Sequence, residues 1–135
     1  MRKDLLEMCE NLAKDIQDSY EGGVTMTDAE KLAGKFLYAQ MQISNEIASV
    51  DLDARMKRSG VKAVKAAIYL EHATKTEKKP SDVLLSAMVD ANEIVQGQLR
   101  AEAQAEVNRD WLRNQLTIFG EAHVHFRTIA KGSFQ

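Results

Sequence analysis

The amino-acid sequence predicts an all-α protein, an elongated helical hairpin or bundle formed by one domain over residues 1–135. Its composition is the first reason: it has one proline and 6% aromatic residues, beside many strong helix formers such as Ala, Leu, Glu, Lys and Gln. The second reason is apolar spacing by threes and fours along most of the chain, which is typical of amphipathic helices. No alternation of apolar and polar residues is long enough to predict a strand.

A first amphipathic helix is predicted over residues 3–19, and Gly22 and Gly23 end it. The segment "TDAE" from Thr27 to Glu30 has the pattern of a capping box at the start of a second helix. The apolar positions of the first helix are Leu5, Leu6, Met8, Cys9, Leu12 and Ile16.

The second helix has no strong stop signal before residue 72, which makes it about 45 residues and about 68 Å long. A single small domain cannot cover such a helix. We therefore expect it either to break near "SVDLD" or Gly60, or to pack against other subunits. Its apolar positions are expected to be Leu32, Phe36, Ile43, Ile47 and Val50, continued by Leu52, Met56, Ala63, Ala67 and Leu70.

A polar turn, "ATKTEKKP", follows and ends at Pro80, and Ser81 can cap a short helix over "SDVLLSAMVD". The segment "DANE" either restarts or continues this helix. A long C-terminal helix is predicted over about residues 93–130, ended by Gly132. The apolar stripe near its end comprises Leu112, Leu116, Phe119, His123 and Phe126.

Charge is distributed unevenly along the chain, although the net charge is only −2. The basic segment, residues 55–80, holds eight of the eighteen Lys and Arg residues and two of the twenty acids. On a helical wheel four of its cations fall within about 80°, with Tyr69 in the same sector and with Met56, Ala63, Ala67 and Leu70 on another face. These four cations are Arg55, Arg58, Lys62 and Lys65.

Three interpretations of the basic segment stay open: a solvated surface, a nucleic-acid-binding surface, and a surface that docks on acidic residues of a sister subunit, for instance within residues 1–54. No acid occurs from Arg55 to Leu70, which is unusual for a solvated helix. An aromatic residue among cations suits base stacking beside phosphate contacts. The candidate nucleic-acid-binding residues are Arg55, Lys57, Arg58, Lys62, Lys65, Tyr69, Lys75, Lys78 and Lys79.

Signals for other kinds of chemistry are weak. His123 and His125 are two residues apart without completing ligands, so we expect His123 to pack in the core and expect no metal or other cofactor. The lone Cys9 cannot form an intramolecular disulfide. No phosphate-binding glycine loop or nucleophile elbow is present, which predicts a non-enzymatic protein. Without a signal peptide or membrane span, we expect a cytoplasmic location.

Residues 50–132 resemble the UvsY-type recombination mediators of tailed phages. The similar segments are "DARMKRSGVKAVKAAIYLE", "KKPSDVLLSAMVDAN" and "DWLRNQLTIFGEAHVHFRTIAKG". The resemblance implies a small helical protein that assembles into a ring, binds single-stranded DNA and helps a recombinase replace a single-strand-binding protein, in the host cytoplasm if phage-encoded. It assigns DNA contacts to Lys62, Lys65 and Tyr69, whereas Ala66 and Ala67 stand where another basic residue is expected.

The sequence thus predicts an oligomeric, non-enzymatic accessory protein that binds single-stranded DNA by neutralising phosphates along its cationic stripe. The alternative is an adaptor or inhibitor whose basic helix docks on an acidic protein surface.

Overall fold

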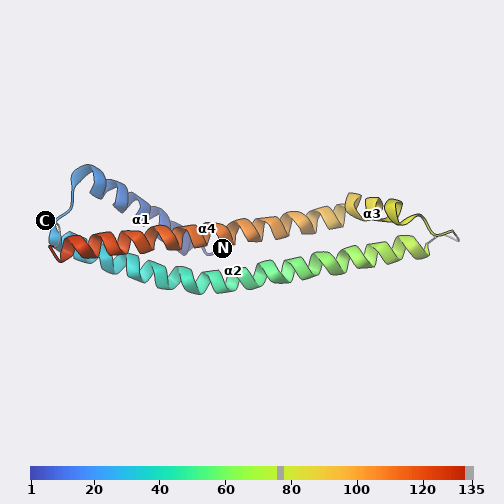
Figure 1. The fold of residues 1–135 in the computed structure, drawn as a ribbon, viewed down its shortest axis with the longest axis horizontal. Coiled ribbons are helices and arrows are strands. Elements are labelled where there is room, and N and C mark those ends of the chain that lie inside the picture. The colour runs from blue at the N-terminus through green and yellow to red at the C-terminus, as the bar shows by residue number, and fades with distance from the viewer. Residues whose placement is uncertain (76–77, 133–135) are drawn as a thin grey trace. The chain divides into compact units, whose positions relative to one another are not determined.

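The computed structural model describes residues 1–75 and 78–132, and all of their regular secondary structure is helical (Figure 1). The prediction of an all-α fold is confirmed. The chain divides into two compact units. Unit 1 comprises Met1–Ser49 and Asp110–Gln135, and unit 2 comprises Val50–Arg109. The predicted turn before Pro80 includes residues 76–77, which lie outside the described residues.

Helix α1 spans Lys3–Gly22 and ends at Gly23, whose φ of 75° suits glycine and whose N–H donates to the Ser19 carbonyl over 2.9 Å. Helix α2 spans Met26–Thr74. The hydroxyl of Thr25 caps its start by accepting from the Asp28 N–H over 3.1 Å. The predicted capping role of Thr27 is therefore wrong, because the helix begins two residues earlier and Thr27 already lies in its first turn.

The 49 residues of α2 are continuous through both predicted break points, "SVDLD" and Gly60. Helix α3 spans Asp82–Ala91, and the Ser81 hydroxyl caps it as predicted, accepting from the Leu84 N–H over 3.2 Å. Helix α4 spans Glu93–Ala130 and matches the predicted bounds. The chain restarts rather than continues at Asn92, whose extended backbone separates α3 from α4 and whose side-chain oxygen accepts from the Ile94 N–H over 2.9 Å.

Unit 1 has an aromatic core. The Phe36 ring lies 5.5 Å from that of Phe119 and 5.5 Å from that of Phe126, and all three side chains are buried. Helix α1 contributes Leu5, Cys9 and Leu12 to the same buried interior. Three helical segments thus surround a core of large side chains.

Unit 2 buries smaller side chains: Ile68 from α2, Val89 from α3 and Val95 from α4 form an apolar cluster against which Tyr69 packs. Along α2 the buried positions are Val50, Ala54, Val61 and Ile68, spaced by four, seven and seven residues, so they lie on one face of the helix and the opposite face is exposed. The predicted apolar face is consequently wrong for this part of α2. The exposed side chains there are Leu52, Met56, Ala63, Ala67 and Leu70.

Candidate nucleic-acid interface

All nine candidate residues lie in unit 2, on α2 or on the turn after it. The cationic stripe of α2 flanks the buried line defined by Ala54, Val61 and Ile68. Its side chains are therefore close enough to reach acids on neighbouring helices. The structure brings several of these cations to such acids.

Arg58 is the most fully paired cation of the stripe. Its guanidinium donates to Glu106 over 2.6 Å and to Glu102 over 3.2 Å, both on α4. The hydrogen bond to Glu106, followed by that to Glu102, raises the pKa of Arg58. Two carboxylates already occupy this guanidinium, so a phosphate has to displace them to bind it.

Two other stripe cations, and Lys57 outside the stripe, have one carboxylate partner each. Arg55 pairs with Asp51 over 3.0 Å, and Lys57 with Asp53 over 2.9 Å, each one turn away on α2. The ammonium of Lys65 lies 3.8 Å from an Asp90 oxygen. These are exposed pairs in which a polyanion can compete at little cost.

Lys62 and Lys75 are exposed and make no ion pair within the described residues. Lys78 and Lys79 are also exposed, on the turn after α2, and the ammonium of Lys79 lies 3.5 Å from Asp82. Lys62 and the lysines at and after the end of α2 therefore carry the most accessible positive charge of the candidate interface.

Tyr69 is half-buried. Part of its ring packs against the Ile68, Val89 and Val95 cluster, and its hydroxyl donates to Asp82 over 3.0 Å. It also lines an open groove of about 620 Å³. The other residues lining this groove are Lys65, Ala66, Leu70, Ser86, Val89 and Asp90. One side of the Tyr69 ring is thus covered by the apolar cluster, whereas another side of the ring is accessible from the groove.

The acids that neutralise the stripe are the functional feature that sequence reasoning missed. Counted over whole units, unit 2 has ten basic and nine acidic residues, a net charge of +1, whereas unit 1 has eight and eleven, a net charge of −3. Glu102 and Glu106 are one turn apart on α4 and so lie on one face. The sequence could have revealed that these two glutamates share a face of α4, but it contains no indication that this face lies opposite Arg58.

His123 is partly buried, and its Nδ1 lies 2.9 Å from the Ala33 carbonyl oxygen, to which it donates. This geometry agrees with the packed role expected for it. Among residues 1–75 and 78–132 there is no cluster of three or more His, Cys, Asp or Glu side chains arranged to hold a metal ion. In the same part of the chain, no helix combines the length and the apolar character that a membrane crossing requires.

Comparison with known proteins adds no relative: no protein-family model, no curated protein and no solved structure matches this chain.

Proposed function

We propose that the protein is a non-enzymatic accessory protein that binds single-stranded DNA through the basic side of unit 2 and acts as an oligomer, in the manner of a recombination mediator. The observation that carries the proposal is the series of accessible cations along α2 and the following turn, with Tyr69 among them. A recombinase and a single-strand-binding protein are the partners that this role requires.

The mechanism combines two kinds of contact. Lys62, Lys65, Lys75 and the lysines of the turn bind phosphates, while the accessible side of Tyr69 stacks on a base. Each copy contributes few free cations, because Arg58 is held by two glutamates. Binding one strand at several copies together compensates for a weak single site.

The first test is a salt titration of a fluorescently labelled oligodeoxythymidine with a Lys62→Ala, Lys65→Ala variant. If each lysine contacts one phosphate, the slope of log affinity against log salt becomes shallower by about 1.4. The matched control is Lys14→Ala with Lys31→Ala, which removes the same charge from exposed positions of unit 1. Equal effects of the two variants, or no binding by the parent at low salt, would contradict the proposed site.

A second test separates stacking from charge. Tyr69→Ala should weaken binding by about 1–3 kcal/mol with little change in salt slope, since stacking releases no counterions. Tyr69→Phe removes only the hydroxyl that donates to Asp82 and should bind like the parent. If Tyr69→Phe loses as much affinity as Tyr69→Ala, the hydroxyl rather than the ring is what matters.

The second candidate function, docking on an acidic protein surface, is favoured by the apolar side chains exposed next to the cations. Met56 is 65% exposed and Leu70 is 62% exposed. DNA has no need of a continuous apolar stripe, whereas a protein partner buries one. The Lys62→Ala, Lys65→Ala variant distinguishes the two functions, because the second predicts no DNA phenotype.

A further inference from the structure

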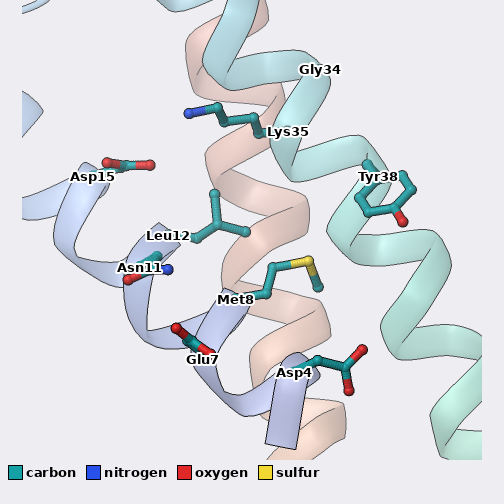
Figure 2. Close-up of a pocket in the computed structure, with 9 residues that line it drawn as sticks. All are labelled: Asp4, Glu7, Met8, Asn11, Leu12, Asp15, Gly34, Lys35 and Tyr38. Carbon is teal, nitrogen blue, oxygen red and sulfur yellow. The ribbon is translucent and has the colours of Figure 1, made fainter. Parts of the chain in front are cut away.

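Unit 1 contains an open groove of about 570 Å³ between α1 and α2 (Figure 2). Met8 and Leu12 extend from α1 into it, and Tyr38 stands on the α2 side. The carboxylates of Asp4, Glu7 and Asp15 border it, and Lys35 and Asp15 extend toward each other from opposite sides at one end. The groove therefore combines an apolar floor with a mainly acidic rim.

The three rim carboxylates differ in their partners, and Lys35 extends toward Asp15 (Figure 2). Glu7 and Asp15 make no ion pair with any described residue, whereas Asp4 is held by Arg2 over 2.7 Å. Helix α1 carries six acids and two lysines, a net charge of −4. This differs from unit 2, where most of the helical cations have carboxylates from their own unit. A ligand for the groove should thus be basic and apolar.

The chain itself presents a surface of that chemistry. Along one side of α2 in unit 2, Leu52 and Met56 are 60% and 65% exposed, and the Arg55 side chain between them is 75% exposed. Lys62 follows two turns after Arg55. We call residues 52–62 the docking segment.

We propose that the groove between α1 and α2 binds the docking segment of a second copy of this chain, with Met56 on Met8 above the buried Leu12 of the groove floor. Arg55 then exchanges its partner Asp51 for Glu7 of the second copy. The groove cannot take the docking segment of its own chain. Its Gly34, Lys35 and Tyr38 wall and the docking segment are parts of one uninterrupted helix, α2, which cannot fold back on itself.

The dimensions of the two surfaces agree. The rim of α1 from Asp4 to Asp15 is about 16 Å long, and the docking segment is about 15 Å long, at 1.5 Å per residue. Arg55 and Lys62 are about 10 Å apart along α2, close to the 12 Å or so that separates Glu7 from Asp15 along α1. Each cation can therefore meet one carboxylate of the rim, while Leu52 and Met56, about 60–100° from Arg55 around α2, pack alongside these pairs.

Because the two surfaces differ, the contact joins copies head to tail, either reciprocally in a pair or onward to further copies. The contact concerns assembly and is measured without DNA, so it stands or fails separately from the proposed DNA binding. Arg55 and Lys62 belong to both proposals, so the effect of Arg55→Glu on association is measured in the absence of DNA and Lys62 is left unchanged.

The experiment is light scattering of the full chain at micromolar concentration, with charge exchange across the contact. The parent should have a mass that is a multiple of 15.1 kDa. Glu7→Arg and Arg55→Glu should each weaken association by about tenfold or more, and combining them should restore much of the loss. The matched controls, Glu10→Arg on α1 and Arg100→Glu on α4, should associate like the parent, since neither residue lines the groove or the docking segment.

A parallel pair tests the apolar half of the contact. Met56→Gln should weaken association, whereas Val107→Gln, at a residue 61% exposed on α4, should not. Circular dichroism checks that every variant retains the helicity of the parent. A monomeric parent, failure of the combined charge exchange to recover mass, or equal effects of each variant and its control would overturn the proposal.

Discussion

Units 1 and 2 both contain parts of α2 and α4, but they hold these helices together differently. Unit 1 buries Phe36, Phe119 and Phe126 between three helical segments. Unit 2 buries alanine, valine and isoleucine along α2, and its helices are bridged by pairs such as Arg58 with Glu102 and Glu106. Both units are thus stabilised by apolar burial, through large aromatic rings in unit 1 and smaller side chains along α2 in unit 2, where exposed ion pairs also bridge the helices.

The difference has a consequence for function. Exposed ion pairs contribute little to stability and are weakened by salt and by competing anions. The cations of unit 2 can therefore exchange their carboxylate partners for the phosphates of a bound strand without loss of an apolar core. Unit 1 differs: it combines an aromatic core with a net charge of −3, and Glu7 makes no ion pair with a described residue.

The largest effect should come from the aromatic core. Phe36→Ala should destabilise the protein by about 3–5 kcal/mol, since it removes a buried ring that contacts two others. Val61→Ala removes two methyl groups in unit 2 and should cost about 2 kcal/mol. Urea unfolding followed by circular dichroism measures both.

Trp111 is the single tryptophan and lies in unit 1, so its fluorescence reports on that unit. If the units unfold separately, Phe36→Ala should shift the fluorescence transition and Val61→Ala should shift only the dichroism. If Val61→Ala lowers the free energy of unfolding more than Phe36→Ala does, the core of unit 1 is not the more important of the two cores for stability.

The next effect concerns Cys9, which is buried in unit 1. Burial raises the pKa of this thiol to about 11, from an ordinary value of 9.0. Below pH 9 the thiol is protonated whether the chain is folded or not. Between pH 9 and pH 11 it ionises only in the unfolded chain, so the stability contributed by the neutral buried thiol is lost as pH rises. Cys9→Ala should flatten the dependence of the urea midpoint on pH in this range, and an unchanged slope would contradict the assignment.

Much of the fold could be predicted because local signals determine it. Ser81 marks the start of α3 and Gly132 the end of α4 through their own chemistry, and apolar spacing indicated the extent of α4. The continuity of α2 through Gly60 could not be predicted, since a single glycine weakens a helix without breaking it when packing supplies the rest.

The outward face of α2 in unit 2 was predicted wrongly for a specific reason. Met56 and Leu70 are larger than Ala54 and Val61, so hydrophobicity alone favoured burying them. The structure buries the smaller residues beside α4 and leaves the larger ones exposed. Which face of a long helix is covered depends on the partner helix, and the partners of Arg58 on α4 were equally invisible in the sequence.

Two helix caps provide a smaller, matched test of the units. Thr25→Ala in unit 1 removes the acceptor of the Asp28 N–H, and Asn92→Ala in unit 2 removes the acceptor of the Ile94 N–H. Each should cost about 1 kcal/mol. Hydrogen exchange should show the loss at the start of α2 for the first variant and at the start of α4 for the second. Uniform loss of protection throughout the chain in either variant would mean that the units open together.

The smallest effects should come from two glycines of α4, one in each unit. At Gly97 in unit 2 an added Cβ meets nothing within 4 Å, so Gly97→Ala should stabilise the protein by about 1 kcal/mol through helix propensity alone. At Gly120 in unit 1 the added Cβ would lie 3.0 Å from Nε2 of Gln40, which must move. The amide is the end of a flexible side chain, so Gly120→Ala should gain less than Gly97→Ala while still folding. Urea midpoints of the two variants measure the difference directly. If Gly120→Ala were the more stabilising variant, the close approach of Gln40 to Gly120 would not limit the gain, contrary to the contact described here.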